Sequence, residues 1–162
     1  MSYLLKKEGI NLAIAILVVI LVVFSVRILV VKITGVSSPI VVVKGISMLP
    51  TLYYGDLVVI HKVDPFDIKV GDIIVYKSEY RGELVIHRVI KIVKGPQCNP
   101  VCYITKGDNN VLSDAGSLQP INGISYDKVL GVVYTIEVDI NGRSMEAPLR
   151  IPYIGLFVLM FR

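Results

Sequence analysis

Tryptophan is absent from this chain of 162 residues, and cysteine and histidine occur only twice each. Two cysteines exclude a small scaffold built from disulfides and a structural zinc site made of four thiolates. Charged residues are also scarce, at 19% of the chain against 54% for hydrophobic ones. This composition excludes a disordered chain and is unusually apolar for a soluble domain. The length predicts about one domain.

The positive charge is concentrated at the N-terminal end. Residues 1–32 hold four basic side chains and one acidic one, whereas residues 33–162 hold thirteen basic and twelve acidic ones. A protein that binds nucleic acid needs its positive charge as a patch on the folded domain. The near balance in residues 33–162 therefore predicts no nucleic-acid partner.

The excess of apolar residues lies in one run near the N-terminus. No charged residue occurs in 10–26, and after Arg27 the apolar run continues to Val31. About 20 apolar residues cross the ~30 Å of hydrocarbon in a bilayer. We therefore predict a transmembrane signal-anchor helix at 10–31, with residues 1–9 as a cytoplasmic segment. A cleaved signal peptide and a buried core helix are the alternatives, although the run is long for the first and lacks an amphipathic stripe for the second.

Short β-branched runs follow a linker at 32–39. Gly, Asp and Pro separate these runs, which is the punctuation expected between strands. Residues 40–147 are therefore predicted to form a mostly β domain, either a small barrel or packed antiparallel sheets. The predicted strands are 40–43, 57–63, 73–77, 84–93, 101–105 and 129–140.

Two further segments leave alternatives open. The apolar segment at 148–162 is too short to span a bilayer, so it is a terminal strand, a membrane contact or a truncated second span. Cys98 and Cys102 form a local disulfide if the domain lies outside the cytoplasm, and are two free thiols otherwise.

Three polar features interrupt the apolar strands, and two of them suit nucleophilic catalysis. Ser47 stands between Gly45 and Pro50 on a turn that can expose its hydroxyl and leave backbone N–H groups free for an oxyanion. His87 and His61 each lie within a strand pattern, and a serine nucleophile needs such a base near pH 7. From these residues alone, a loop serine and a structural histidine are the commoner explanations, and the two histidines are not separable.

The third feature is the polar loop from Thr105 to Asn110, which Ser113 and Asp114 follow. An aspartate in such a loop can hold a histidine in one tautomer and stabilise its cation. An Asx-turn, or weak cation binding by Asp108 and Asp114, is the alternative. The spacing does not match an EF-hand loop, and we predict no metal site.

Taken in order, these motifs resemble the type I signal peptidases, specifically the archaeal and endoplasmic-reticulum branch. Each motif is weak alone, but the ordered set is specific and covers most of residues 10–135. The segments that carry the resemblance are the apolar helix, Ser47-Met48-Leu49-Pro50-Thr51, Gly55–Ile60, His87-Arg88-Val89 and Gly107-Asp108-Asn109-Asn110 with Asp114.

The resemblance implies a membrane-anchored serine endopeptidase that removes N-terminal signal peptides from secretory and membrane preproteins. It implies that Ser47 is the nucleophile and that His87 is the general base, where the bacterial branch has a lysine. It favours His87 over His61. Asp114 matches the third catalytic member, and Asp108 matches a supporting acid that shapes the loop.

The same resemblance implies the setting of the enzyme. It predicts a single pass in the plasma membrane, or in the endoplasmic-reticulum membrane, with the catalytic domain on the extracytoplasmic side. Its partners would be preproteins, the lipid bilayer and accessory subunits, and it would need no cofactor. One departure is Gly45, because many members carry a serine there whose hydroxyl helps to bind the oxyanion. The second oxyanion donor is therefore open.

Two other classes of protein are alternatives. A non-catalytic membrane-anchored β-domain that binds a partner protein would not need Ser47 or His87. A self-cleaving Ser–Lys repressor-type protease should carry a DNA-binding domain, where this chain has an apolar helix. The apolar cluster beside Ser47 either contacts lipid or substrate or packs in the core. Its members are Met48, Leu49, Leu52, Tyr53 and Tyr54.

Overall fold

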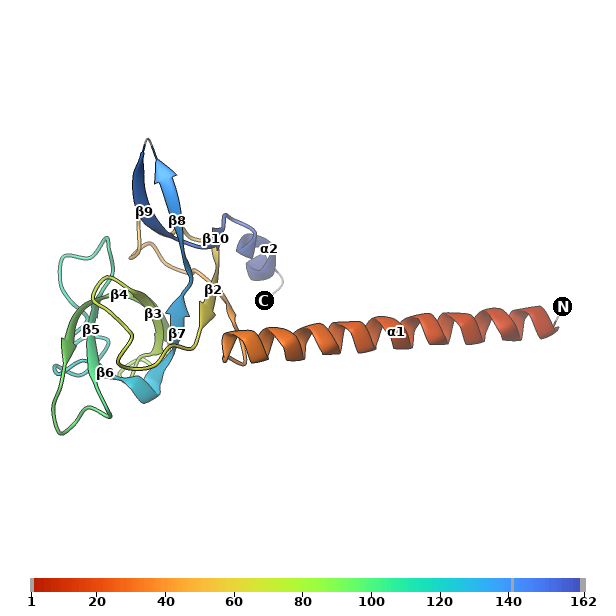
Figure 1. Ribbon diagram of the computed structural model, residues 1–162, viewed down its shortest axis with the longest axis horizontal. Helices are drawn as coiled ribbons and strands as arrows, with labels where there is room; N and C mark the ends of the chain where they lie inside the picture. Colours follow the sequence, from red (N-terminus) through yellow and green to blue (C-terminus); the bar gives the residue numbers. More distant parts are fainter. Residues whose placement is uncertain (1, 141, 161–162) are drawn as a thin grey trace.

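The computed structural model describes residues 2–140 and 142–160. Its first element is a long helix, α1 (Ser2–Thr34), which projects away from a β domain that holds the rest of the chain (Figure 1). Within α1, Asn11–Thr34 is long and apolar enough to cross a membrane. The helix exceeds the predicted span at both ends, so the expected linker is helical up to Thr34 and begins at Gly35.

The side chains of α1 from Asn11 to Val30 do not pack into the domain. Leu12, Leu17 and Phe24 are each more than half exposed, and the apolar side chains between them are similarly open. This exposure rules out the buried core helix. An apolar surface of this extent suits an apolar solvent, because water would leave the burial energy of sixteen large side chains unrealised.

The domain is built on one antiparallel sheet, and the prediction of a mostly β fold is confirmed. The strands lie in the order β1-β2-β7-β3-β4-β5-β6, and β10 also pairs with β2. They curve round one another on the side of the molecule away from α1 (Figure 1). The strands are β1 (Ile40–Val42), β2 (Leu57–His61), β3 (Ile73–Lys77), β4 (Leu84–Val93), β5 (Cys102–Lys106), β6 (Ile124–Ser125), β7 (Val129–Val133) and β10 (Arg150–Ile151).

Strand β3 lies at the centre and is buried on both faces. Because side chains alternate along a strand, Ile73 and Val75 enter one apolar cluster while Ile74 and Tyr76 enter the other. A strand covered on both sides needs a continuous apolar run, which explains its sequence Ile-Ile-Val-Tyr.

The same alternation determines which polar side chains lie on the face of the sheet that carries Ile74 and Tyr76. His87 stands opposite Ile74 in the β3–β4 ladder, on the face of β4 that carries Val89. Thr105 stands opposite Val89 in the β4–β5 ladder. His87, Thr105 and Tyr76 therefore point to one side of the sheet from three neighbouring strands.

The structure divides the strand expected at 129–140 into β7 and β8 (Thr135–Ile140). β8 pairs in a separate hairpin with β9 (Arg143–Pro148), which was not expected from the sequence. The short strand β6 and a 3-10 turn (Tyr126–Lys128) before β7 were not expected either. The C-terminal segment forms β10 and then the short helix α2 (Gly155–Met160), so only β10 matches the expected terminal strand. Phe161 and Arg162 lie outside the described residues.

Asp56 ties this C-terminal segment to the rest of the domain. Its side chain is fully buried and its Oδ2 accepts hydrogen bonds from Arg150 Nη1 at 2.6 Å and from the Tyr53 N–H at 3.0 Å. Its Oδ1 accepts from the Tyr153 N–H at 3.3 Å. Next to it, the Gly155 N–H donates to the Gly55 carbonyl at 2.9 Å. The start of α2 thus lies against the turn that precedes β2.

The apolar cluster beside Ser47 divides between core and surface. Met48 and Leu52 are buried in the apolar cluster that contains Ile73 and Val75. This burial excludes contact of these two side chains with lipid or substrate. Tyr53 and Tyr54 are exposed. Cys98 and Cys102 form a disulfide just before β5, in agreement with the first of the two alternatives.

Candidate active site

Ser47 opens a tight turn that is fixed from both sides. The Leu52 N–H donates to the Met48 carbonyl at 2.9 Å, and the buried side chains of both residues anchor the turn in the core. This leaves the Ser47 side chain directed away from the core, at the edge of a cleft.

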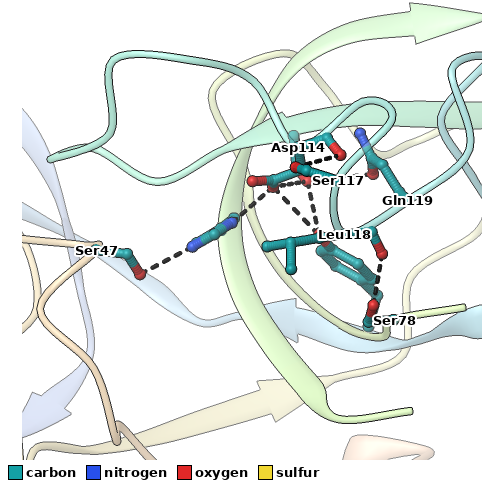
Figure 2. Close-up of polar contacts among 9 residues, drawn as sticks. Ser47, Ser78, Asp114, Ser117, Leu118 and Gln119 are labelled. Atoms are coloured by element: carbon teal, nitrogen blue, oxygen red, sulfur yellow. Dashed lines mark hydrogen bonds and ion pairs between the residues drawn. The ribbon is translucent and has the colours of Figure 1, made fainter. Parts of the chain in front are cut away.

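His87 lies between Ser47 and Asp114, which contact the two different nitrogens of its ring. Figure 2 labels Ser47 and Asp114 at the two ends of this row of contacts. The His87 Nε2 is 2.8 Å from Ser47 Oγ, and the Nδ1 is 2.6 Å from Asp114 Oδ2. An ionised carboxylate only accepts hydrogen bonds, so Nδ1 carries the proton and Nε2 is free to accept the proton of the serine hydroxyl. The imidazole is buried, at 4% exposed, and Asp114 is 2% exposed.

This order of groups is the arrangement that activates a serine in serine proteases. The imidazole takes the hydroxyl proton, and the carboxylate fixes the tautomer and stabilises the imidazolium that forms. The three residues come from a turn, from β4 and from the loop after β5. They are brought together only by the sheet, since 40 residues separate the first two and 27 the last two.

Asp108 does not join this chain of contacts but lies beside it. Its two carboxylate oxygens accept from Arg88 Nε at 2.8 Å and from Arg88 Nη2 at 2.7 Å, and Oδ2 also accepts from Thr51 Oγ1 at 2.5 Å. Partial burial pushes the pKa of Asp108 upward, but the hydrogen bonds from Arg88 and Thr51 outweigh burial, and the pKa lies below its ordinary value.

The loop that carries Asp108 also holds the serine turn. The Asn109 N–H donates to the Ser47 carbonyl at 2.7 Å, and Asn109 Nδ2 donates to the Ile46 carbonyl at 3.2 Å. A Cβ on Gly107 would lie 2.6 Å from the Ser47 carbonyl oxygen, so only glycine permits this approach. The Gly-Asp-Asn motif therefore positions the serine turn through three consecutive residues.

A cleft of about 1320 Å³ opens at Ser47 and His87. One wall is formed by β1 and the other by the start of β4, and both walls are largely apolar. The apolar residues along it include Ile40, Val42, Leu84, Ile86, Leu130 and Leu159. An extended peptide between these walls would pass the serine hydroxyl.

The structure separates the two histidines, which the residues alone do not. His61 lies on β2, where its ring stacks on Tyr134 with the centroids 3.8 Å apart. Within residues 2–140 and 142–160, its Nδ1 has no hydrogen-bond partner. Burial lowers the pKa of His61, against a backbone hydrogen bond with Val132 and the charge of Asp72. This histidine therefore packs against Tyr134, and the hydrogen bond to Ser47 comes from His87 instead.

Four residues around Asp114 were not anticipated. Thr105 and Tyr76 donate to its carboxylate, and Gln119 lies against Thr105. Ser78 Oγ donates to the Leu118 carbonyl at 2.6 Å and holds the same loop against the end of β3 (Figure 2). A tyrosine within an apolar strand carries no signal of its own, because only the sheet register brings Tyr76 to the carboxylate. A glutamine before a proline carries none either, because Gln119 reaches the cluster only through the fold of the loop, where it contacts Thr105.

Gly45 leaves room where the resemblance places a second oxyanion donor. A Cβ on Gly45 would lie 3.9 Å from both the backbone nitrogen and the Oγ of Ser47, with no closer atom. A short side chain would fit there. The second donor remains an open position in this chain.

Comparisons with known proteins agree with this arrangement. A family model described as "Signal peptidase, peptidase S26" matches residues 10–95, just over half of the chain. The human protein named "Signal peptidase complex catalytic subunit SEC11C" is 32% identical over 127 residues, covering 78% of this chain and 59% of the relative.

Two further organisms carry similar proteins. The Dictyostelium discoideum protein "Signal peptidase complex catalytic subunit sec11" is 37% identical over 100 residues, which cover 60% of this chain and 54% of that protein. The Plasmodium falciparum (isolate 3D7) protein "Signal peptidase complex catalytic subunit SEC11" is 31% identical over 115 residues, 71% of this chain and 61% of the relative.

These matches define the class. The chain belongs to the signal peptidase family, peptidase S26, and its curated relatives carry the name of the catalytic subunit SEC11. The resemblance found in the sequence is thereby confirmed. The chain spans about three fifths of the length of these relatives.

Proposed function

We propose that this protein is a serine endopeptidase that removes N-terminal signal peptides from secretory and membrane preproteins. The observation that carries the proposal is the chain of contacts from Ser47 through His87 to Asp114, at 2.8 and 2.6 Å, in a member of the signal peptidase family. The apolar cleft beside these residues is suited to an extended, apolar stretch of peptide.

The proposed reaction begins with the serine hydroxyl. Ser47 Oγ attacks the carbonyl carbon of the scissile bond while His87 Nε2 takes its proton, and the carbonyl oxygen becomes an oxyanion. The backbone N–H groups of the turn at Ser47 stabilise that oxyanion, and each well-placed donor contributes on the order of 10²–10³ in rate.

His87 then returns the proton. It protonates the leaving amine, which releases the mature protein and leaves the signal peptide as an ester on Ser47. A water molecule, deprotonated by His87, hydrolyses the ester. Asp114 stabilises the imidazolium at both stages, and Asp108 holds the loop in place. The steps use only these groups and water, so the proposed reaction needs no metal or organic cofactor.

The proposal places α1 in a membrane and the β domain at its extracytoplasmic surface. A substrate held in the same membrane presents its cleavage site at a fixed height, and a tethered protease meets it at a raised effective concentration. The membrane is the plasma membrane or the endoplasmic-reticulum membrane. Accessory subunits are part of the proposal because the relatives are named as subunits of a complex. Intact mass of the membrane-bound protein tests whether the apolar segment is retained or cleaved.

Cleavage of a secretory preprotein by the detergent-solubilised full chain tests the activity. We expect Ser47→Ala, His87→Ala and Asp114→Ala each to lower the rate by on the order of 10³-fold or more, since triad members act as a unit. His61→Ala is the matched control and should retain cleavage. If folded wild type cuts nothing, or Ser47→Ala cuts equally well, the proposal fails and a membrane-anchored binding domain becomes the better account.

A further inference from the structure

One carboxylate oxygen at the site receives an unusual number of hydrogen bonds. Asp114 Oδ2 lies 2.6 Å from His87 Nδ1, 2.5 Å from Thr105 Oγ1 and 3.2 Å from Tyr76 Oη. Thr105, Tyr76 and the adjacent Gln119 are all fully buried. The site therefore contains a dry polar cluster behind the aspartate, which a simple triad does not require.

We propose that Thr105, Tyr76 and Gln119 form a positioning network that keeps Asp114 charged and turned towards His87, and thereby sets the pH range in which His87 acts as a base. The proposal rests on the proposed function for its kinetic test. The three residues contact the aspartate or each other, not the substrate, so they act through Asp114.

The direction of each hydrogen bond follows from counting protons. Thr105 has a single hydroxyl proton, and at 2.5 Å the carboxylate of Asp114 is its acceptor. The hydrogen-bonding groups around Gln119 are satisfied when its amide is turned so that the nitrogen donates to Thr105 Oγ1 at 3.3 Å and to the Tyr103 carbonyl at 3.2 Å, while the oxygen accepts from the Thr105 N–H at 3.1 Å. In this orientation Gln119 offers no acceptor to the Thr105 hydroxyl, whose proton is directed towards Asp114.

Tyr76 supplies the second donor at every working pH. Burial raises the pKa of the Tyr76 phenol far above its ordinary value, and the charge of Asp114 adds to the rise against a hydrogen bond with Thr105. The phenol therefore stays neutral and keeps its proton. Two other charged groups lie beside His87 and Asp114. They are Arg88 on β4 and Asp108 in the loop after β5, and they form an ion pair with each other.

Removing a donor has a predictable consequence for His87. His87, Thr105 and Tyr76 donate hydrogen bonds to the Asp114 carboxylate and disperse its negative charge. When Thr105 or Tyr76 no longer donates, the negative charge on the buried carboxylate is more concentrated. That charge attracts the imidazolium more strongly than the neutral imidazole. The pH at which His87 loses its proton should therefore rise when the network is cut.

The kinetic test measures kcat/KM against pH for the full chain in detergent. Thr105→Val should move the acidic limb of the kcat/KM profile to higher pH by about one pH unit, because a hydrogen bond to a charged group contributes a free energy of about that size. Tyr76→Phe should move it in the same direction by less, since its bond is longer. Thr105→Ser retains the hydroxyl and should restore the wild-type profile.

A matched control separates the network from simple loss of a buried hydroxyl. Tyr103 is as buried as Tyr76, but its hydroxyl donates to the Pro65 carbonyl at 2.6 Å. Tyr103→Phe should leave the acidic limb in place. A Thr105→Val variant that is slower or less stable at every pH, with an unmoved limb, would overturn the proposal and leave these residues a structural role only.

A second readout does not depend on cleavage. The chain has only two histidines, so its imidazole NMR signals can be assigned with His61→Gln. The titration midpoint of His87 should rise in Thr105→Val, and in Tyr76→Phe if the first variant does not fold. An unchanged midpoint overturns the network whatever the activity. A raised midpoint in a protein that cleaves no preprotein supports the network and counts against the proposed function alone.

Discussion

Arg88 Nε and Nη2 donate to the two carboxylate oxygens of Asp108, at 2.8 and 2.7 Å. The preceding residue on β4, His87, points to the opposite face of the strand and contacts Ser47 and Asp114. Successive residues of β4 therefore contact the two acidic residues of the loop after β5. One face of β4 carries His87, and the other face carries Arg88, which fixes the loop that contains Asp114.

Asp108→Asn should weaken the contact with Arg88 without changing Ser47, His87 or Asp114. The bidentate ion pair is lost, and the loop that positions the Ser47 carbonyl becomes less rigid. We expect kcat/KM to fall by about 10- to 100-fold, as for a displacement of about 1 Å, whereas Asp114→Asn should cost far more. Steady-state cleavage of a preprotein by the two variants provides the measurement. Equal losses would show that Asp108 has a role beyond holding the loop.

The same pair predicts a pH dependence of stability. Because the folded-state pKa of Asp108 lies below its ordinary value, its stabilising contribution is complete above the unfolded-state pKa, about 3.9, and disappears as the pH falls through the folded-state pKa. Wild type should therefore exceed Asp108→Asn in melting temperature by a constant amount above about pH 5, and the difference should close below pH 4. A difference that persists in acid would assign the contribution to packing.

Gly45→Ser should add the missing oxyanion donor. A Cβ fits at this position with its nearest atoms 3.9 Å away, so the variant should fold normally. We expect kcat to rise by up to about tenfold, less than the 10² typical of an optimised donor. Gly45→Ala, which adds the Cβ without the hydroxyl, is the control and should not raise kcat. An increase in both variants would attribute the gain to a stiffer backbone instead.

Gly155→Ala should loosen the C-terminal segment. Its Cβ would lie 2.7 Å from both the Gly55 carbonyl oxygen and Val42 Cγ1, so α2 must move away from β1. We expect a loss of about 1–3 kcal/mol in the free energy of unfolding, as for other overpacked sites, and faster proteolysis after β10. Gly95→Ala, where a Cβ meets open space, should be neutral. Unaltered proteolysis in Gly155→Ala would show that α2 is not held by this contact.

The Cys98–Cys102 disulfide closes a loop of only a few residues. Loop-closure entropy then limits its contribution to roughly 2 kcal/mol, and the bridge lies before β5, away from Ser47. Replacing both cysteines by serine should lower stability by no more than this and leave kcat unchanged. Denaturant unfolding with and without reductant measures it. A large loss of cleavage would mean that this loop contacts the substrate.

The strands were predictable because local sequence specifies them. The runs at 73–77 and 84–93 coincide with β3 and β4, since apolar alternation and Gly-Asp turns act over a few residues. The run at 129–140 was expected as one strand, so its division into β7 and β8 and the pairing of β8 with β9 were missed, although the Asn-Gly pair at positions 141–142 is a hairpin signal in sequence. The second strand of this hairpin, β9, is too polar to be recognised by alternation alone.

The site was only partly predictable, for a different reason. Ser47, His87 and Asp114 were found through their order along the chain, and neither spacing nor residue type distinguished His87 from His61. The distinction arises from register: His87 stands opposite Ile74, on the face that the aspartate approaches. The roles of Tyr76 and Gln119 have no local signal, and Thr105 was noted only as the start of the polar loop. Thr105 and Tyr76 meet only at the Asp114 carboxylate, and Gln119 joins them through Thr105.

The contact between Asp56 and Arg150 joins positions 94 residues apart, and it braces the turn that follows Ser47. Because a ribosome makes a chain from its N-terminal end, Arg150 is synthesised after α1 and after Ser47, His87 and Asp114. The contact that braces the serine turn can therefore form only when these three residues have already been made.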